Sequence, residues 1–493
     1  MDGCENNNED GEEMTNRHFH SIEEAQQFLN AKFGGEESFD VCIKNIYIKQ
    51  MDALVVYVSG LVKGSDLTEI LINLQYEESE LAVYDPTYFK AHFNFQGVDK
   101  ATSVDDFLLG VLSGRVGLVT EHGFCYLAEL REYPGRSPEE PDNEKVIRGS
   151  RDGFAENIIQ NTSLIRRRIR STELRFSMHK VSSLGQTDVV VSYMNQLVND
   201  EHLQWILERL KQIEHDGLTM SDKSLEEWLF KQRFHPLPFV RYSERPDIVA
   251  AHLLEGHIAI LVDTSPSVML VPVTMFHLLQ HAEEYRQAPL IGSMMRILRY
   301  AAVLLSFLLL PLWYLFATHE HLLPDKLAFL GVQEASKIPL YLQLILADFG
   351  IEYLRIAAIH TPTPLSTAMG LIAGIIIGQI AIDVGLFSSE VVLYTALAAI
   401  FTFAIPNYEL SISVKVFRIL LLTAVALFGV NGFFIGILLL FMYFCSLRPM
   451  NIPYMWPLVP FFPKAFMRVF IRFPMSDDAP RPFILSAKQR KRS

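Results

Sequence analysis

The stretch ILLLTAVALFGVNGFFIGILLLFMYFCSL, residues 419–447, holds no charged residue over 29 positions. A membrane-spanning helix needs about 20 apolar residues. This stretch is long for one span, so it tilts, or breaks near Gly429 and Gly432 and crosses twice. Four further apolar segments precede it, at residues 300–318, 338–358, 365–382 and 391–408. Together they predict an all-α, multi-span membrane domain over residues 286–475.

The charge of the chain is divided in the same way. Residues 300–493 carry a net charge of +4 and the preceding residues −17, within a total of −13. An acidic, charge-rich part therefore precedes an apolar part. The chain starts with acidic residues and has no apolar secretory signal, so we expect its N-terminus in the cytoplasm. The four cysteines have no paired spacing, which argues against a disulfide framework or a zinc ribbon.

Alternating strand and helix patterns predict two small α/β lobes in the acidic part, at residues 21–145 and 184–285. Residues 1–20 are acidic and rich in Asn, which predicts a disordered tail. Ser21 and Glu24 have the spacing of a capping box at the start of the first helix. Residues 146–183 are interpreted as a linker between the lobes, with a basic amphipathic helix at about 153–171.

The apolar stripe of the linker helix consists of Phe154, Ile158, Ile165 and Ile169. Arg166, Arg167 and Arg170 are expected to point away from it. Such a basic run is also found in nucleic-acid-binding proteins. Because the soluble part is acidic, we favour a solvated face that meets the acidic domains, and we expect no nucleic-acid partner.

Catalytic motifs are missing from the sequence. It has no phosphate-binding loop, no dinucleotide fingerprint and no nucleophile elbow. His277 and His281 have the spacing of two zinc ligands, but Leu278 stands where a zinc protease has its Glu. We therefore expect no enzymatic activity, no cofactor and no metal site.

Three charged residues interrupt the second apolar segment. Asp348, Glu352 and Arg355 are spaced i, i+4 and i+7, so they share one helix face. A charge within a membrane is costly and often functional. Two interpretations stay open: a self-paired stripe buried against protein, or a stripe that faces a water-filled vestibule.

The third apolar segment carries two different faces. Gly370, Gly374 and Gly378 form a doubled G-x-x-x-G stripe, which lets helices approach closely. The opposite face carries a line of residues suited to a pore, since isoleucines exclude water and carboxylates attract cations. These residues are Ile372, Ile376, Gln379 and Asp383. The alternative is that the isoleucines face lipid and Asp383 ends the helix.

Basic residues flank the apolar part on both sides. Arg286, Arg296 and Arg299 precede it, and the tail at residues 476–493 is basic at its end. The positive-inside rule places both flanks in the cytoplasm. Both ends inside require an even number of spans, and four to six segments are available.

Several motifs resemble those of the A subunits of bacterial spore germination receptors. In the acidic part these are EPD at 140–142, RGSRDGF at 148–154, LIRRRI at 164–169, ERPD at 244–247, LEG at 254–256 and LVD at 261–263. In the apolar part they are EYLR at 352–355, GIIIGQ at 374–379, IPNY at 405–408 and PY at 453–454. The resemblance runs from about residue 20 to 475. Ile356 and Ala373 depart from the usual pattern, which weakens the comparison with the nutrient-sensing members.

The resemblance implies a multi-pass protein of the spore inner membrane with a two-lobed cytoplasmic domain. It also implies homo-oligomers, taken to be pentamers, that conduct monovalent cations released during germination beside other germination membrane proteins. An oligomeric ion channel is therefore the leading hypothesis. The alternative is a non-conducting scaffold or signalling subunit. A secondary transporter is disfavoured because no inverted repeat of broken helices is visible.

Overall fold

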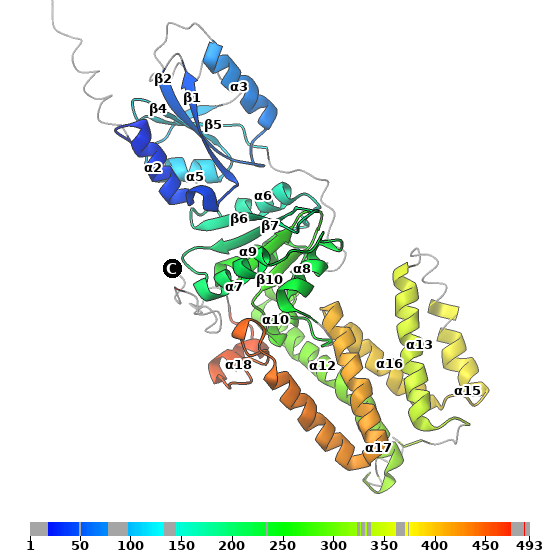
Figure 1. Cartoon of the computed structure of the whole chain (residues 1–493). Coiled ribbons are helices and arrows are strands. Elements are labelled where there is room, and N and C mark those ends of the chain that lie inside the picture. The colour runs from blue at the N-terminus through cyan, green and yellow to red at the C-terminus, as the bar shows by residue number, and fades with distance from the viewer. Residues whose placement is uncertain are drawn as a thin grey trace, which may run out of the picture. The chain divides into compact units, whose positions relative to one another are not determined.

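The structure is a computed structural model that describes residues 18–48, 51–76, 97–132, 144, 146, 148–232, 235–322, 326, 331–332, 337–360, 370–372, 374–474 and 488. The chain forms two compact units (Figure 1). The first contains residues 1–232, 240–272 and 478–493, and the second contains residues 233–239 and 273–477. The first unit holds both β-sheets, and the described part of the second unit is helical.

The first lobe is a five-stranded antiparallel sheet with helices on both faces. Strand alternation directs neighbouring residues of β2 into two different cores. Val55 packs with Leu74 of α3, whereas Leu54 packs with Leu29 of α2 and Phe107 of α5. The elements are α2 (Ile22–Phe33), η2 (Gly35–Glu37), β1 (Val41–Ile48), β2 (Met51–Val58), α3 (Gly64–Tyr76), β3 (Val98–Lys100), α5 (Val104–Leu112), β4 (Val116–Thr120) and β5 (Cys125–Ala128).

The predicted cap of α2 is present. The Ser21 hydroxyl accepts a hydrogen bond from the Glu24 amide at 3.1 Å. The Glu24 carboxylate reaches back to the amide of His20 at 2.8 Å, one residue before the position expected for a capping box. The sequence therefore gives the start of this helix correctly.

The second lobe repeats the topology of the first. Its strands lie in the order β6-β7-β9-β10-β8, which matches β1-β2-β4-β5-β3 strand for strand. In both lobes one helix precedes the first strand, and helices separate the second, third and fourth strands. The elements are α6 (Ile158–Arg168), β6 (Leu174–Val181), β7 (Thr187–Met194), α7 (Asp200–Lys211), α8 (Ser221–Phe230), β8 (Arg241–Ser243), α9 (Pro246–Glu255), β9 (Ile258–Val262) and β10 (Val268–Val271).

Two expectations about the linker at 146–183 were wrong. Strand β6 lies within it and pairs with β7 from Leu174 to Val181, so the second lobe starts earlier than residue 184. Helix α6 is also shorter than 153–171, because Asn157 caps its start through the amides of Ile159 and Gln160. Phe154 therefore precedes the helix, although it is buried.

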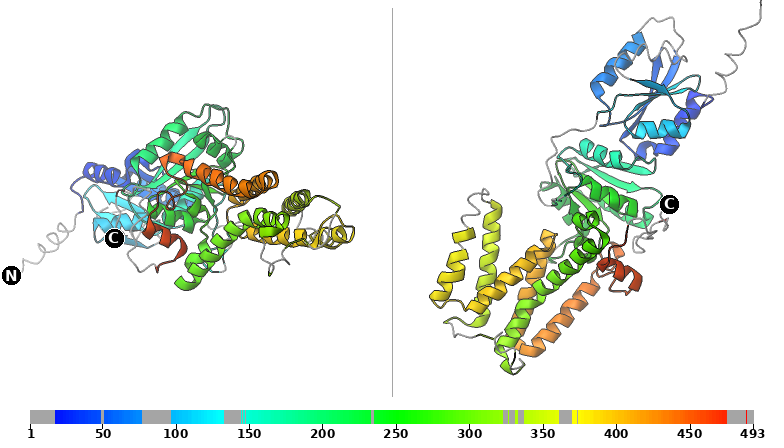
Figure 2. Two further views of the ribbon diagram at one scale, coloured as in Figure 1. Left: turned by 90° about the horizontal axis from the view of Figure 1, so that it is seen from below. Right: turned by 180° about the vertical axis from the view of Figure 1, so that it is seen from behind.

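The second unit consists of helices and short turns. Helices α12 and α17 lie side by side, as Figure 2 shows from behind. A core of Leu315, Leu421, Val425 and Phe433 joins them. The elements are α10 (Met275–Leu278), α11 (Ala282–Arg286), α12 (Pro289–Thr318), η3 (Glu320–Leu322), α13 (Leu340–His360), η5 (Ile376–Ile380), α15 (Ala381–Asp383), α16 (Ser389–Phe403), α17 (Tyr408–Ser446), η6 (Pro449–Asn451) and α18 (Pro463–Phe470).

Helix α17 is a helical hairpin that turns at Gly429. This residue has φ +58° and ψ −135°, a conformation that L side chains rarely adopt. The rings of Phe417 and Phe444 lie 5.1 Å apart, whereas a straight helix would separate them by about 40 Å. A Cβ on Gly436 would lie 2.7 Å from Leu421 of the opposite limb. Of the two possibilities for residues 419–447, the break is the one observed.

Among the described residues, α12 and α17 are the two helices long and apolar enough to cross a membrane by length and composition. Helix α16 is apolar but shorter. These helices, together with the sequence pattern, indicate membrane association. The apolar segments of the sequence thus correspond to α12, α13, the described residues between 370 and 383, α16 and the two limbs of α17.

Candidate functional site

The three charged residues of the second apolar segment lie on α13, and their partners come mostly from α17. Two cations of the first limb, Lys415 and Arg418, meet Asp348 and Glu352. We call Asp348, Glu352, Arg355, Lys415 and Arg418 the charge cluster. Their spacing brings them together because i, i+3, i+4 and i+7 positions share a helix face on both α13 and α17.

Arg418 connects four helices. Its Nη2 donates to Asp348 Oδ1 at 2.6 Å, and its Nη1 donates to the Ser306 carbonyl at 2.9 Å and to Thr402 Oγ1 at 3.2 Å. Ser306 belongs to α12 and Thr402 to α16, and their hydroxyls lie 2.8 Å apart. The side chains of Arg418 and Asp348 are only 1% and 3% exposed. This is a fully desolvated ion pair, which is stable only when nearly all of its polar atoms have partners.

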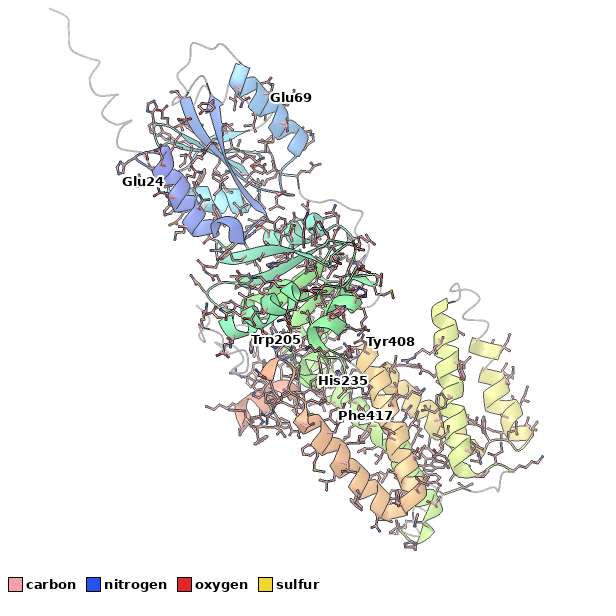
Figure 3. The ribbon with its side chains drawn as sticks, in the orientation of Figure 1. Glu24, Glu69, Trp205, His235, Tyr408 and Phe417 are labelled. Atoms are coloured by element: carbon pink, nitrogen blue, oxygen red, sulfur yellow. The ribbon has the colours of Figure 1, made fainter. Side chains whose placement is uncertain are left out.

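Lys415 continues the network toward the end of α13. Its Nζ donates to the Asp348 carbonyl at 2.8 Å and to Glu352 Oε2 at 2.9 Å. Glu352 also pairs with Arg355, whose Nη1 donates to Ser411 Oγ at 3.3 Å. The guanidinium of Arg355 lies 4.8 Å from the ring centre of Tyr408, which Figure 3 labels on α17. The charges of the stripe are thus paired within one chain, chiefly by α17.

The charge cluster can hold the helices together, but two of its buried polar atoms lack a hydrogen-bond partner. Asp348 Oδ2 and Arg418 Nε have no hydrogen-bond partner among the residues that the structure describes. The cluster holds two carboxylates and three cations. Within the stripe, Glu352 pairs with Arg355, as the first interpretation expected. A stripe that faces a water-filled vestibule stays a prediction. No group of three metal-ligating side chains occurs in the described part of the chain.

Four residues of the site were not predicted from the sequence: Lys415, Arg418, Ser306 and Thr402. The two cations stand directly before the uncharged stretch at 419–447, so they were set outside the span. Their i, i+3 spacing is a signal that could have paired them with Asp348 and Glu352, because both sets form single faces. The hydroxyls of Ser306 and Thr402 carry no such signal, since they contribute only through the packing of α12 against α16.

The third apolar segment is described at residues 370–372 and 374–383. A Cβ added at Gly370, Gly374 or Gly378 would meet no heavy atom within 4 Å in the described part of the chain. The opposite line is also exposed: Ile372 is 56% and Ile376 50% exposed, and Gln379 and Asp383 are exposed too. The glycine face is open and the opposite line is exposed in the described part of the chain, and the predicted packing and pore roles stay predictions.

The predicted line of pore residues crosses an irregular turn. Residues Ile376–Ile380 form a π-helical turn, in which hydrogen bonds run to the fifth residue and not the fourth. A regular 100° rotation per residue therefore does not hold from Ile376 on to Gln379 and Asp383. The single face drawn from the sequence is wrong in its regular register, and π-turns of this kind are frequent at functional sites.

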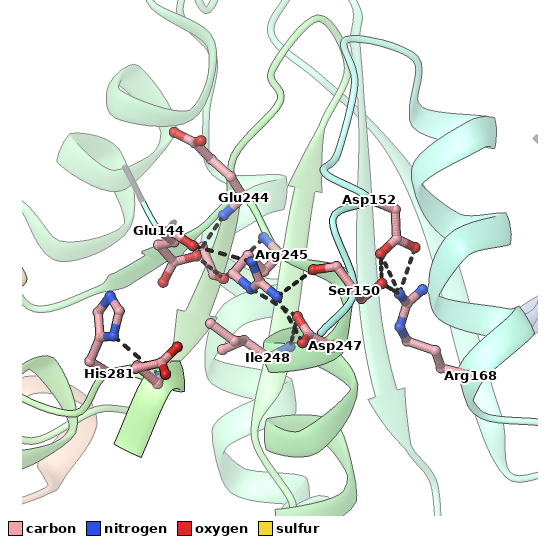
Figure 4. A network of polar contacts seen from close by, with 11 residues as sticks. Glu144, Ser150, Asp152, Arg168, Glu244, Arg245, Asp247, Ile248 and His281 are labelled. Carbon is pink, nitrogen blue, oxygen red and sulfur yellow. Dashed lines mark hydrogen bonds and ion pairs between the residues drawn. The ribbon is translucent and has the colours of Figure 1, made fainter. Parts of the chain in front are cut away.

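In the first unit, residues of the RGSRDGF, LIRRRI and ERPD motifs form one network, which Figure 4 shows, whereas EPD at 140–142 lies outside the described residues. Arg245, at the N-cap of α9, donates to the Asp247 carboxylate at 3.1 Å and to the Ser150 carbonyl at 2.8 Å. Arg168, at the end of α6, binds the Asp152 carboxylate at 2.5 Å. These contacts attach Ser150 and Asp152 to α6 and α9. We call Glu144, Ser150, Asp152, Arg168, Arg245 and Asp247 the signature network.

Two carboxyl groups of the signature network have shifted pKa values of opposite sign. Burial raises the pKa of Glu144, although Arg241 and the hydroxyl of Ser243, which donates to it at 2.7 Å, act in the other direction. Burial would also raise the pKa of Asp152, but hydrogen bonds from Arg168 and Ser150 outweigh burial and lower it. The network therefore contains one carboxyl that resists ionisation and one that favours it.

The predicted basic face of α6 is only partly solvated. Arg167 and Arg170 are exposed, but Arg166 is 1% exposed and donates to Asp40 of the first lobe at 2.7 Å. Its guanidinium also covers the ring of Phe176 at 5.0 Å. The expectation that Arg166 faces solvent was wrong, while the expectation that this helix meets an acidic group holds for Asp40.

Comparison with known proteins gives a consistent set of relatives. Residues 27–484 match the family described as Bacillus/Clostridium GerA spore germination protein. Stage V sporulation protein AF of Bacillus subtilis (strain 168), which the sequence motifs also resemble, is 45% identical over 95% of both chains. Spore germination protein KA of the same organism is 30% identical over 92% of this chain and 85% of its own. A crystal structure of the N-terminal domain of the A subunit of the Bacillus megaterium spore germinant receptor GerK3 covers 52% of this chain and 96% of its own, with 24% identity and a TM-score of 0.41.

Proposed function

Because this chain belongs to the Bacillus/Clostridium GerA spore germination protein family, we propose that it is an oligomeric ion channel subunit of the spore inner membrane that releases monovalent cations during germination. The subunits form a homo-oligomer, with five copies as the family resemblance implies. It works without catalysis of its own, beside other germination membrane proteins.

The observation that carries this proposal is the pair of exposed faces on the third apolar segment, one lined by Gly370, Gly374 and Gly378 and the other by the predicted pore residues. Its glycine face offers open space within 4 Å, which a helix of a neighbouring subunit can fill. Its other face combines exposed isoleucines with Gln379 and Asp383. Lipid tails solvate isoleucine well but not an amide and a carboxylate. A central aqueous path surrounded by several copies satisfies both faces at once.

The charge cluster gives the channel a rigid frame. Arg418 fixes α17 to α12, α13 and α16. Segment 370–383 lies between α13 and α16 in sequence, so both of its flanks are attached to helices that this arginine holds. A rigid frame allows a narrow constriction to keep its width, which is required if isoleucines are to close it by excluding water.

The proposed topology places six segments in the membrane and both termini on the cytoplasmic side. The α17 hairpin supports an even number, because each of its limbs is a separate helix. The contacts of the C-terminal tail support the placement of both termini on the same side of the membrane. Lys488 binds Asp200 of the second lobe at 2.7 Å and its amide donates to the Leu197 carbonyl at 3.3 Å.

The test is conductance of the purified full chain in a planar bilayer. We expect discrete cation-selective currents, and Ile376→Ala should raise resting conductance, because shorter side chains allow water into the constriction. Ile400→Ala is a matched control, since Ile400 is 60% exposed on α16, outside the proposed pore. Equal currents from both variants would contradict the gate, and absence of any current would contradict the channel.

A non-conducting scaffold is the second candidate, and one observation favours it. Every charge of the cluster finds its partner within a single chain, so these charges need no water-filled path. The two repeated α/β lobes would then be the binding part, and the helices an anchor. An electrically silent protein that still forms its oligomer in the same bilayer would support this candidate.

A further inference from the structure

Helix α18 and its flanks, residues 461–473, form an amphipathic element at one end of α12. Its inward side is aromatic: Phe470 lies 4.9 Å from the ring of Tyr300 and 5.1 Å from the ring of Phe466, and Val469 is buried. Pro463 stands in the first turn, where the missing amide hydrogen costs nothing. The element is therefore held by its own side chains against α12.

The contacts fix the level at which α18 lies along α12. The Arg472 amide donates to Ser293 Oγ at 2.9 Å, and Arg296 Nη1 donates to the Arg468 carbonyl at 3.1 Å. Tyr300, the third anchor, is the first residue of the uncharged run at 300–318. Helix α18 thus lies beside the last turns before the apolar run begins. In a bilayer, this is the level of the lipid headgroups.

The outward side of the element mixes large apolar groups with cations. Phe461 is 60% and Met467 55% exposed, and Ile471 and Phe473 are exposed as well. Lys464 and Arg468 are exposed on the same short helix. On the adjoining start of α12, Leu290 is 83% and Met294 55% exposed. Exposure of this surface to water is unfavourable, because several large apolar side chains would be hydrated at once.

The charges on this surface are cations. Residues 410–476 contain no Asp or Glu, while Lys464, Arg468 and Arg472 lie within them, and Asp477 and Asp478 follow in the sequence. The nearby Glu284 is 1% exposed and already paired with Arg296 at 2.7 Å. A surface with basic and large apolar residues, at headgroup level, fits the acyl and headgroup boundary of an anionic leaflet.

We propose that residues 461–473 are an interfacial anchor that inserts Phe461, Met467 and Ile471 among the upper acyl chains and binds anionic phospholipid headgroups through Lys464 and Arg468. This inference rests on the proposed membrane insertion of α12. A second copy of this chain is a less suitable occupant, because Lys464 and Arg468 would each need an acidic partner on the same apolar surface.

The experiment measures the depth of single labelled positions in the full chain. Variants without the four native cysteines receive one new cysteine and an environment-sensitive fluorophore, in phosphatidylcholine and phosphatidylglycerol nanodiscs. Met467→Cys reports on α18. Met220→Cys is the matched control, a methionine 70% exposed in the second lobe, and Leu438→Cys reports on α17, where Leu438 is 56% exposed in the middle of the second limb.

Nitroxide-bearing lipids then give the depth. We expect Met467→Cys to be quenched most by a nitroxide near the headgroup, Leu438→Cys by a nitroxide deep in the acyl region, and Met220→Cys by neither. If Leu438→Cys is unquenched, membrane insertion itself is wrong, and the anchor with it. If Leu438→Cys is quenched but Met467→Cys is not, only the anchor is wrong.

Headgroup choice is tested with the same label. We expect stronger quenching of Met467→Cys by nitroxide-bearing phosphatidylglycerol than by the matching phosphatidylcholine. The double change Lys464→Gln and Arg468→Gln should reduce this preference by about fivefold for each charge. Equal quenching by both lipids in the unmodified helix would overturn the anionic part of the proposal.

Discussion

Breaking the pair between Asp348 and Arg418 should destabilise the helical unit, and the structure ranks the two single changes. Asp348→Asn leaves Arg418, 1% exposed, without a carboxylate, and leaves Lys415 with Glu352 alone. Arg418→Met leaves Asp348 with Lys415, whose Nζ lies 3.5 Å from Oδ1. Removing one partner of a buried pair costs about 3–5 kcal/mol. We expect Asp348→Asn near the upper end of this range and Arg418→Met near the lower end.

The assay is thermal unfolding of the purified full chain in detergent, followed by a signal from the helical unit. For a unit of about 200 residues, 1 kcal/mol corresponds to about 2–4 °C in Tm. Arg418→Met should therefore lower Tm by about 6–12 °C, and Asp348→Asn by more. Met is chosen because it keeps much of the volume of Arg while removing the charge.

The double variant separates this explanation from general damage to packing. When both partners are absent, no uncompensated charge remains buried, so the double change should cost at least 1 kcal/mol less than the sum of the two single changes. Glu352→Gln is the matched control, since Glu352 is 19% exposed and should cost less. Additive effects in the double variant, or unchanged Tm in both single variants, would refute the buried pair.

Three further outcomes follow from the contacts described above. Gly374→Leu should reduce oligomer size in detergent at unchanged expression, because a Cβ at this position meets no heavy atom within 4 Å in the described part of its own chain, whereas a larger side chain would hold a neighbouring helix away; an unchanged oligomer would argue against this interface. Arg166→Met should destabilise the first unit by about 3–5 kcal/mol and speed proteolysis between the lobes, since it leaves Asp40 buried without its cation, whereas Arg170→Met, at an exposed position, should stay within about 0.5 kcal/mol; equal effects would contradict the role of Arg166. Because the pKa of Glu144 is raised in the folded protein, its stabilising contribution is complete below the ordinary pKa of about 4.3 and is lost as pH rises through the folded value; Glu144→Gln should remove this part of the pH dependence in a series of unfolding curves, and an unaltered series would exclude it.

Much of the fold of the first unit could be predicted from local patterns. The cap at Ser21, the hairpin of β4 and β5, and Pro246 in the first turn of α9 all depend on neighbouring residues in sequence. Strand β6 was missed because its exposed half alternates around His179 and Lys180, which hides an apolar pattern. The repeat of one topology in both lobes also escaped, since topology can be repeated without any repeated motif.

The candidate site could be predicted only in part, for a physical reason. The face of α13 follows from spacing alone, so Asp348, Glu352 and Arg355 were identified. Their partners on α17 depend on tertiary packing, which spacing within one segment does not encode. The π-turn at Ile376–Ile380 likewise depends on hydrogen bonding that helix periodicity assumes to be regular. Arg166 shows the same limit, because a charge expected in water is buried by a partner 126 residues away.

The hairpin at Gly429 has a consequence for how related sequences vary. Its limbs run antiparallel, so Leu421 meets Gly436, and Phe417 meets Phe444. Contacts of this kind pair positions that lie at similar distances before and after the turn. Substitutions in relatives should therefore be correlated as mirror images about Gly429, a larger residue on one limb accompanying a smaller one on the other. A residue inserted into one limb alone would shift every later pair, so length changes are expected in both limbs together or in neither.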